Sequence, residues 1–245
     1  MSVAFALLLS GTLLLSPWLL GPHEEMKPPE VSPLLRFFWY LNRLYCGLWH
    51  RVEVPADDPL PAEGPVLLVA NHTCGIDHMV LQAATDRKLG FVIAQEYYDV
   101  PVVHWFCKAL GCIPVKRDGR DLGATRAVLR ALDSGAVVPI FPEGRINPTS
   151  GREFLPARPG AAWVALKKKV PVIPAYISGT PETNEITRSL MTPSAARVVF
   201  GPPIDLDEFR TPAAARDTDI QEAASARIMK AIRDLKEQPT QEVRS

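Results

Sequence analysis

The sequence predicts an α/β fold with a mixed, largely parallel central sheet flanked by helices, and an N-terminal membrane-associating helical segment. Two observations predict the sheet: short apolar runs recur along the chain, and helical hydrophobic patterns separate them. A third observation predicts the membrane segment, because residues 1–22 carry no charged side chain. We therefore expect residues 1–52 to form a membrane anchor with an interfacial helix, and residues 53–245 to form one globular domain.

The first 22 residues approach the ~20 apolar residues that a helix needs to cross a bilayer. A cleaved signal peptide is the alternative, but the segment has no basic residues at its start and no A-x-A cleavage site follows it. Gly11 and Pro17 leave a re-entrant hairpin open as a further alternative. In either membrane-bound form the segment would hold the protein at a membrane.

Residues 34–50 have the spacing of an amphipathic helix. Apolar residues recur on one side, and aromatic rings flank them: Leu34, Phe38, Leu41, Tyr45 and Leu48, with Trp39, Tyr40 and Trp49. Arg36, Arg43 and His50 fall on the opposite side. This pattern predicts an interfacial helix, and an ordinary core-facing helix is the alternative. Together with Arg51, the arginines favour a cytoplasmic position for the domain that follows.

Charge and cysteine content exclude several classes of protein. The chain has 27 Lys and Arg residues against 27 Asp and Glu residues, so it lacks the basic field of a general nucleic-acid-binding protein. Its four cysteines form no C-x-x-C pair, which argues against a zinc ribbon or a disulfide scaffold. We expect reduced thiols and an anion site built from local residues.

A linker rich in proline and glycine, residues 55–65, precedes the alternating strands and helices of the domain. The predicted strands are residues 66–70, 91–94, 112–116, 137–141, 172–177 and 197–200. The predicted helices are residues 76–88, 97–110, 121–133, 161–169 and 220–236. Strands that alternate with helices in this way indicate an α/β sandwich.

In such sheets ligands bind beyond the carboxyl ends of the strands, and Asn71 and His72 directly follow the first strand. On one continuous helix, His72 and Asp77 would point ~140° apart. We therefore place His72 in the turn before the helix, where the Asp77 carboxylate can accept a hydrogen bond from one ring nitrogen. The other nitrogen is then free to remove a proton as a general base.

Two other interpretations of His72 remain open from its spacing alone. His72 could cap the helix, or His72, Asp77 and His78 could bind a metal ion. The metal interpretation is the weaker, since the only other nearby histidine, His104, lies in an aromatic run that is typical of a packing surface or a lipid-facing wall.

Two further strand ends carry charged residues. Lys116 and Arg117 end one strand and suit a phosphate group, although a solvated basic turn is the alternative. Glu143, Gly144 and Arg145 end another strand. Gly144 permits a close backbone approach, so Glu143 could bind a hydroxyl and Arg145 an anion, whereas a structural ion pair is the alternative.

These blocks, in this order, resemble the glycerolipid acyltransferase family that includes the 1-acylglycerol-3-phosphate acyltransferases. The resemblance covers roughly residues 66–178. The blocks are Asn71, His72 and Asp77 of NHxSxxD, the run from Gly111 to Arg117, Phe141-Pro142-Glu143-Gly144, and Val170-Pro171-Val172-Ile173-Pro174, with Arg158 and Gly160 in front of the last.

The resemblance implies transfer of a fatty acyl group from an acyl-CoA or acyl carrier protein thioester to a hydroxyl of a glycerol-phosphate lipid. The expected acceptor is 1-acylglycerol-3-phosphate, which would yield phosphatidic acid. His72 would act as the base and Asp77 would orient it, without a covalent acyl-enzyme, a metal ion or a cofactor. Arg117 and Arg145, with Lys116 and Arg158, would hold the acceptor phosphate, and Glu143 and Gly144 would hold its glycerol.

One departure from the family pattern affects the choice of acceptor. The family usually has Ser two residues after the histidine, and this chain has Cys74. Glycerol-3-phosphate, another lysophospholipid and a lyso-ornithine lipid remain alternative acceptors, and Cys74 as a nucleophile is a further alternative. A non-catalytic membrane lipid-binding protein and a metal-dependent hydrolase are the rival functions. The expected partners are membrane lipids and the acyl donor, not nucleic acid, and the oligomeric state does not follow from the sequence.

Overall fold

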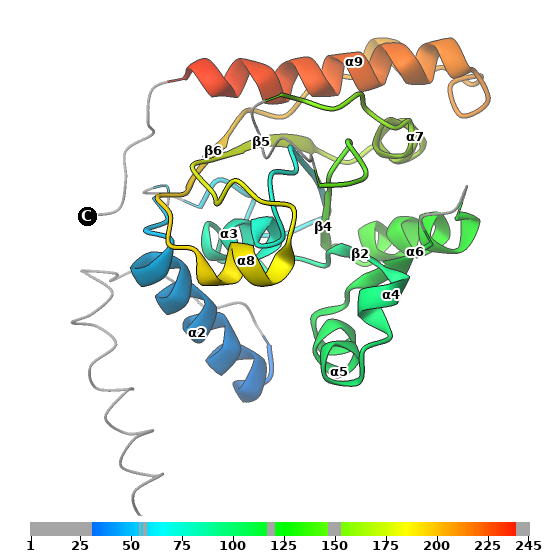
Figure 1. The fold of residues 1–245 in the computed structure, drawn as a ribbon. Coiled ribbons are helices and arrows are strands. Elements are labelled where there is room, and N and C mark those ends of the chain that lie inside the picture. The colour runs from blue at the N-terminus through cyan, green and yellow to red at the C-terminus, as the bar shows by residue number, and fades with distance from the viewer. Residues whose placement is uncertain (1–30, 54, 56–57, 117–120, 147–152, 239–245) are drawn as a thin grey trace, which may run out of the picture.

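The computed structural model describes residues 31–53, 55, 58–116, 121–146 and 153–238. A four-stranded sheet of order β4-β1-β5-β6 lies at its centre (Figure 1). The strands β1 (Val66–Ala70), β4 (Val137–Ile140) and β5 (Val172–Ser178) are parallel, and β6 (Arg197–Phe200) is antiparallel to β5. The prediction of a mixed, largely parallel sheet is confirmed.

A small second sheet extends this layer at the β4 edge. Its strands, β2 (Val92–Ala94) and β3 (Ile113–Val115), are parallel. Just before β2, Leu89 forms a parallel bridge with Val137 at the start of β4. Strand β2 therefore runs in the same direction as β4, and its carboxyl end lies on the same side of the molecule.

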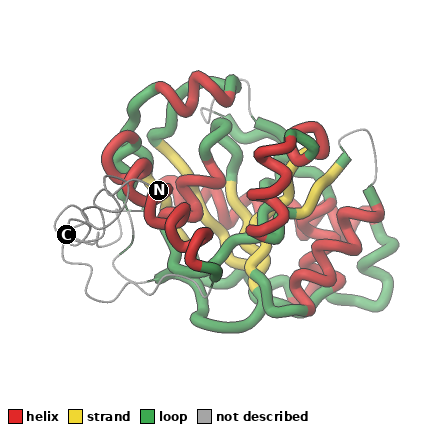
Figure 2. Tube along the Cα trace, turned by 90° about the horizontal axis from the view of Figure 1, so that it is seen from below, coloured by secondary structure: helices red, strands yellow, loops and turns green. Residues whose placement is uncertain are grey.

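Helices cover both faces of the sheet (Figures 1 and 2). They are α2 (Pro33–Trp49), α3 (Asp77–Ala83), α4 (Gln95–Tyr98), α5 (Pro101–Leu110), α6 (Leu122–Asp133), α7 (Gly160–Lys167), α8 (Ile186–Met191) and α9 (Thr218–Asp234), with 3-10 turns at Asp207–Phe209 and Leu235–Glu237. The first described helix, α2, begins at Pro33 after Ser32, whose side chain accepts the N–H of Leu35.

The alternating side chains of β1 divide the core into two layers. Leu67 and Val69 pack into one buried cluster with residues of α6, α7 and α9. Val66, Leu68 and Ala70 pack into the other with residues of α3. All five are essentially inaccessible to solvent, and a fully buried aliphatic side chain contributes about 1.5–3 kcal/mol. The strand that leads into His72 is thus held on both faces.

Three helices differ from the sequence-based expectation. The helix predicted at residues 76–88 ends at Ala83, since Asp58 accepts hydrogen bonds from the Thr85 hydroxyl and from the N–H of Asp86 and draws the chain away. The segment 97–110 forms two helices, because Pro101 starts α5 and keeps Val100 extended. Helix α8 was not predicted, since six residues are too few for a periodic pattern.

Helix α2 packs against the globular domain along the side that carries Arg43. The Arg43 guanidinium lies 3.2 Å from the Asp86 carboxylate, and the Asn42 amide donates to the Met79 carbonyl at 2.9 Å. On the predicted apolar stripe, Leu41 is 47% and Leu48 64% exposed. These residues of the stripe face outward, whereas α2 does pack on the core along another face, where Leu35, Trp39 and Cys46 are buried.

The predicted membrane anchor falls on residues 1–22, which lie outside the described residues, and it stays a prediction. Within the described ranges, no helix has both the length and the apolar character to span a bilayer. The boundary predicted at residue 52 likewise stays a prediction, although α2 contacts α3 and Glu53 forms a bridge with Arg197 of β6.

Candidate active site

The carboxyl ends of β1, β4 and β5 meet at one edge of the sheet, and the candidate site lies there. Asn71 ties the end of β1 to β5: its side-chain amide donates to the Ile177 carbonyl at 2.8 Å and accepts from the Ile177 N–H at 2.7 Å. This pair of bonds continues the strand ladder by one residue. The chain then leaves the sheet at His72, in the turn before α3, as predicted.

His72 and Asp77 form the predicted pair. The His72 Nδ1 atom lies 2.7 Å from Asp77 Oδ2, and the Phe141 ring stacks on the imidazole at 4.1 Å between ring centroids, with 10° between the planes. Because Nδ1 faces the carboxylate, the bond selects the tautomer whose Nε2 carries a free lone pair. The side chain of His72 keeps 15% of its surface exposed, so a substrate can reach it.

Asp77 is fully buried, and a buried carboxylate is stable only where donors surround it. The backbone N–H groups of Thr73 and Cys74 and the Thr73 hydroxyl donate to it, in addition to His72. The Cys74 thiol lies 3.6 Å from Oδ1 and adds a weaker contact. The turn from His72 to Cys74 therefore wraps around the carboxylate and fixes its orientation.

Thr180 extends this network from the segment after β5. Its hydroxyl lies 2.6 Å from that of Thr73. Since the Thr73 proton is directed to the Asp77 carboxylate, the Thr180 hydroxyl is the donor of the pair. A chain of hydrogen bonds thus runs from Thr180 through Thr73 and Asp77 to His72.

Glu143 holds the backbone of the site. Its Oε1 accepts the N–H of His72 at 2.8 Å, and its Oε2 accepts the N–H of Leu155 at 2.9 Å. The residue is 3% exposed; burial raises the pKa of Glu143, and the two N–H donors act against that rise. Both contacts are with backbone N–H groups, so they do not support the alternative of a structural ion pair between Glu143 and an arginine. Contact between Glu143 and the acceptor glycerol stays a prediction.

Gly144 and Arg158 lie against each other beside Glu143. The N–H of Arg158 donates to the Pro142 carbonyl at 2.8 Å, and a Cβ on Gly144 would lie 2.5 Å from Arg158 Cδ. Gly144 has φ +68°, in the region that favours glycine. The structure therefore brings Arg158 to the turn of Glu143 and the exposed Arg145. Arg158 thus lies against the residue that precedes Arg145 in the sequence.

The second predicted cationic block is described only in part. Lys116 is exposed at the end of β3, and its N–H donates to Asp121 at 2.9 Å, while Arg117 lies outside the described residues. Neither residue is linked to His72 by a described contact, so their roles stay predictions.

Cys74 does not have the properties of a nucleophile. It is fully buried, and burial, together with the nearby Asp77 carboxylate, raises the pKa of its thiol to about 12. At neutral pH the thiol stays protonated, and it contributes a weak S–H donor to the pair.

Within the described residues, no three His, Cys, Asp or Glu side chains lie close enough together to bind a metal ion. These residues therefore do not support the interpretation of His72, Asp77 and His78 as a metal site. His78 instead packs edge-on against Phe91 at 5.7 Å between ring centroids.

Sequence reasoning assigned no role to Thr73 or Thr180, and it named Phe141 only as part of a family block, without its stacking on His72. Phe141 directly follows β4, but it is not polar, and Thr180 lies two residues beyond the end of β5, so a search for polar residues directly after strands passes over both. Thr73 carried no separate signal, because its hydroxyl acquires a role only beside Asp77.

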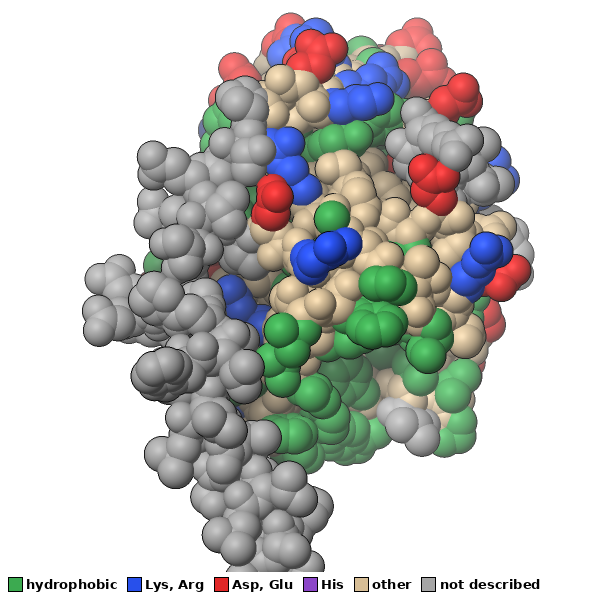
Figure 3. Space-filling view, turned by 60° about the vertical axis from the view of Figure 1, so that its left-hand side comes forward, with side chains coloured by type: hydrophobic (Ala, Val, Ile, Leu, Met, Phe, Trp, Pro, Cys, Tyr) green, Lys and Arg blue, Asp and Glu red, His purple; other side chains and the backbone are tan. Residues whose placement is uncertain are grey.

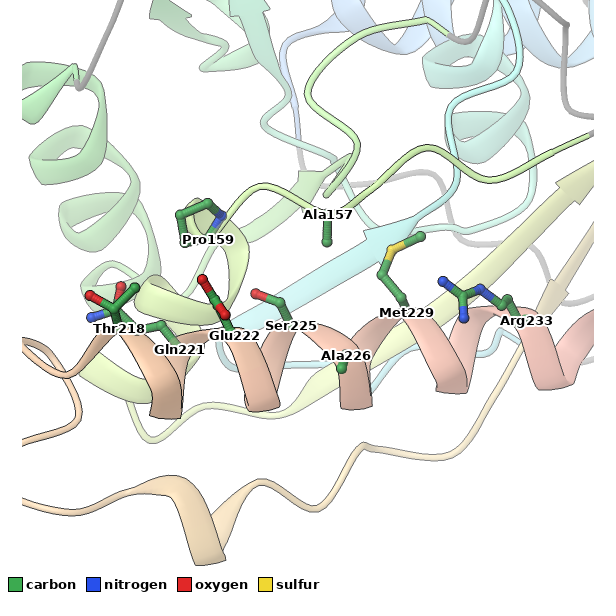
Figure 4. A pocket seen from close by; sticks show the side chains of 9 residues that line it. All are labelled: Ala157, Pro159, Thr218, Gln221, Glu222, Ser225, Ala226, Met229 and Arg233. Atoms are coloured by element: carbon green, nitrogen blue, oxygen red, sulfur yellow. The ribbon is translucent and has the colours of Figure 1, made fainter.

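A surface hollow also occurs on the face covered by α7 and α9 (Figure 4). Its lining comes from the segment before α7 and from one side of α9: Ala157, Pro159, Thr218, Gln221, Glu222, Ser225, Ala226, Met229 and Arg233. It shares no lining residue with the pair of His72 and Asp77.

The site thus lies at the carboxyl edge of an α/β sheet and contains a histidine that is hydrogen-bonded to a buried aspartate. Residues 51–178, just over half of the chain, match the Acyltransferase family. The chain belongs to this family.

Two curated relatives are similar to this chain in sequence. The chain is 30% identical over 165 residues to a lyso-ornithine lipid O-acyltransferase from Rhodobacter capsulatus, covering 58% of each chain. It is 24% identical over 179 residues to a 1-acyl-sn-glycerol-3-phosphate acyltransferase from Bacillus subtilis, covering 72% of this chain and 86% of the relative. The chain spans less than two thirds of several relatives: 58% of the Rhodobacter protein and 42% of uncharacterized mycobacterial proteins.

The fold is similar to that of the 1-acyl-sn-glycerophosphate (LPA) acyltransferase PlsC from Thermotoga maritima, with a TM-score of 0.65. The match has 22% sequence identity and covers 84% of this chain and 81% of the other. The predicted α/β class is therefore also the class of a solved acyltransferase.

Proposed function

We propose that this protein transfers a fatty acyl group from an acyl-CoA or acyl carrier protein thioester to the free hydroxyl of 1-acylglycerol-3-phosphate, which yields phosphatidic acid. One observation carries the proposal: His72 Nδ1 lies 2.7 Å from the buried Asp77 carboxylate, beside the turn of Gly144 and Arg158. This arrangement supports an acceptor that carries both a hydroxyl and a phosphate.

The reaction follows from this geometry. Nε2 of His72 takes the proton of the acceptor hydroxyl while Asp77 stabilises the imidazolium that forms. The hydroxyl oxygen attacks the thioester carbonyl, and the tetrahedral intermediate then collapses to an ester and a thiolate. The imidazolium returns the proton to the thiolate, so the base is regenerated without a cofactor and without an acyl-enzyme.

Arg145 and Arg158, with Lys116 and Arg117 of the second block, would neutralise the acceptor phosphate, and Glu143 and Gly144 would lie against its glycerol. The proposed location is a membrane surface with the catalytic domain on the cytoplasmic side. The apolar sequence of residues 1–22, the outward stripe of α2 and the arginines at 36, 43 and 51 support it.

The test is the release of free thiol from acyl-CoA, measured with and without 1-acylglycerol-3-phosphate. His72→Ala should lower the rate by a factor of about 10² to 10⁴, with an unchanged melting temperature. Asp77→Asn should lower the rate as well, and its matched control is Asp234→Asn on α9, because Asp234 lies in an exposed pair with Lys230. Undiminished activity in His72→Ala would exclude the mechanism.

A lyso-ornithine lipid is the second candidate acceptor, favoured by the relative of that name and by Cys74 in place of the family's serine. This lipid has no phosphate group. Arg158→Ala should impair transfer to 1-acylglycerol-3-phosphate much more than transfer to a lyso-ornithine lipid, and a preference of the wild type for the latter would select the second candidate.

A further inference from the structure

Helix α8 lies against the turn that carries His72 and Asp77, next to α2 (Figure 1). The contact is made at Gly75, a buried residue within that turn. A Cβ on Gly75 would lie 2.9 Å from Cγ1 of Ile186 and 3.0 Å from Oγ of Ser189, both on α8. There is thus no room for a side chain at this point, and α8 supports the backbone of the turn directly.

A chain of hydrogen bonds ties α8 to the end of α2. The Tyr45 hydroxyl lies 2.6 Å from the Leu190 carbonyl of α8 and 2.9 Å from Nε2 of His50. The other ring nitrogen of His50, Nδ1, lies 2.8 Å from the Ser194 hydroxyl in the segment after α8. His50 is completely buried, so neither of its nitrogens is available to solvent.

The donors in this chain follow from its chemistry. A carbonyl can only accept, so the Tyr45 hydroxyl donates to Leu190, and its oxygen accepts from Nε2–H of His50. Nδ1 of His50 then carries a lone pair and accepts from the Ser194 hydroxyl. Burial lowers the pKa of His50, which keeps the imidazole neutral at pH 7. Both nitrogens of a buried ring are therefore paired in one defined tautomer.

The backbone holds the same joint between α2 and the segment after α8. The N–H of Ala196 donates to the His50 carbonyl at 2.8 Å, and the N–H of Ser194 donates to the Trp49 carbonyl at 3.3 Å. The Arg51 guanidinium also donates to the Ser194 carbonyl, at 3.2 Å. Arg51 has φ +43°, a conformation that residues other than glycine seldom adopt. Such a conformation persists where several surrounding contacts hold it, as they do here.

Tyr45 differs from its neighbours on the apolar stripe of α2. Leu41 and Leu48 of this stripe are exposed, and Figure 3 shows apolar side chains gathered over the lower part of one face. The Tyr45 ring is instead partly buried and lies edge-on to the His50 ring, at 5.0 Å between centroids. Its hydroxyl is directed to α8. The orientation of Tyr45 is therefore set by contacts within the protein.

We propose that Tyr45 and His50 are positioning residues for the base. Through the Leu190 carbonyl they hold α8 against Gly75, and α8 in turn holds the backbone that carries His72. This inference rests on the proposed function, in which His72 removes the proton of the acceptor. Neither positioning residue is required to touch a substrate, so their effect should fall on the rate of the chemical step and not on acceptor binding.

Tyr45→Phe tests the proposal, because it leaves the Leu190 carbonyl and the His50 Nε2–H unpaired. In the thiol-release assay with 1-acylglycerol-3-phosphate, kcat should fall by about 10- to 100-fold, the effect of a displacement of up to ~1 Å at a reacting group. KM for the acceptor should stay unchanged. Tyr40→Phe is the matched control, since Tyr40 is an exposed tyrosine of the same helix, and it should keep kcat. An unchanged kcat in Tyr45→Phe would overturn the proposal.

Two replacements of His50 separate its two hydrogen bonds. Glutamine places its amide near the position of Nε2 and can still donate to Tyr45, whereas asparagine places its amide near Nδ1 and can bond only to Ser194. Because the path to α8 runs through Tyr45, His50→Gln should keep most of kcat, and His50→Asn should lose as much as Tyr45→Phe. Equal kcat values in the two variants, or the reverse order, would contradict this path.

Loss of stability alone requires its own control. Trp163→Phe removes the hydrogen bond of the Trp163 indole to the Ala215 carbonyl, between α7 and the segment before α9. It should lower the melting temperature and keep kcat, when kcat is measured well below the melting temperature of each variant. A fall of kcat in Trp163→Phe equal to that in Tyr45→Phe would mean that stability, and not positioning, sets the rate.

Gly75→Ala disturbs the same contact from the other side, since its Cβ would press on α8. It should lower kcat, and its combination with Tyr45→Phe should lower kcat by less than the product of the two effects. Independent effects would contradict coupling through α8. The parent proposal fails separately: undiminished activity in His72→Ala contradicts the proposed function, whereas loss in His72→Ala with full activity in Tyr45→Phe contradicts only the positioning role.

Discussion

One carboxylate oxygen of Glu143 accepts the backbone N–H of His72 at 2.8 Å, so the base is held through its main chain as well as through its ring. The second oxygen accepts the N–H of Leu155 at 2.9 Å. Glu143 therefore joins three segments, the turn after β1, the turn after β4 and the segment before α7. This positioning role is separate from the contact with substrate glycerol expected for the same residue.

Replacement of Glu143 by Gln tests this positioning role. An amide offers one acceptor oxygen, so the NH₂ group must face one of the two backbone N–H donors and leave it unpaired. The free energy of unfolding should fall by about 1–3 kcal/mol, the cost of a buried unpaired donor. Urea denaturation measures the change, and Glu222→Gln on the exposed side of α9 should leave stability unchanged. A Glu143→Gln protein of full stability would contradict the role.

Replacement of Thr180 by Val removes the hydroxyl that donates to Thr73 and keeps the shape of the side chain. Loss of one hydrogen bond of about 1 kcal/mol should lower kcat roughly fivefold, because the Asp77 carboxylate is then held less firmly. KM should not change, since Thr180 acts on the pair of His72 and Asp77 only through Thr73. Thr180→Ser should restore kcat, and a variant that changes KM alone would exclude a positioning role.

Cys74 should tolerate replacement by Ser. A hydroxyl would donate to Asp77 more strongly than the thiol that lies 3.6 Å away, so activity should be kept or increased. The pKa of about 12 and the complete burial of Cys74 also predict that iodoacetamide at pH 7 leaves it unmodified in the native protein. Mass spectrometry should find the adduct on Cys74 only after unfolding. Loss of transfer in Cys74→Ser would revive the nucleophile alternative.

Gly144→Ala should displace Arg158, since the added Cβ would lie 2.5 Å from Cδ and 2.8 Å from Nε of that residue. Like Arg158→Ala, it should raise KM for 1-acylglycerol-3-phosphate by about 10- to 100-fold, the value of a charge-assisted hydrogen bond of 1.5–3 kcal/mol. Steady-state kinetics with varied acceptor measure the effect.

Gly135→Ala is the matched control for this variant. Gly135 has a similar backbone conformation, with φ +82°, but a Cβ there would meet nothing within 4 Å. It should cost stability and leave KM unchanged. If Gly144→Ala acts through Arg158, the double variant should have the KM of Arg158→Ala alone, and additive effects would contradict the displacement.

Most of the fold followed from local patterns. The bounds of β1 and β6 were predicted without error, because apolar runs between breakers mark buried strands. Helix α8 and the break between α4 and α5 were missed, because six residues and one proline leave little periodic signal. In the site, His72, Asp77 and Glu143 were found as polar residues beyond strand ends, whereas the hydrogen bond between Thr73 and Thr180 joins residues 107 positions apart and left no local trace.

The sequence by itself determined the α/β class, the family resemblance and the pair of His72 and Asp77, because hydrophobic period and motif order are properties of neighbouring residues. Only the tertiary structure decided that Glu143 binds two backbone N–H groups, that Arg158 lies over Gly144, and that the stripe of α2 faces outward with Trp105 beside it. Each of these depends on segments that are distant in the chain. Their contacts are set by the packing of the sheet and its helices, which no local pattern encodes.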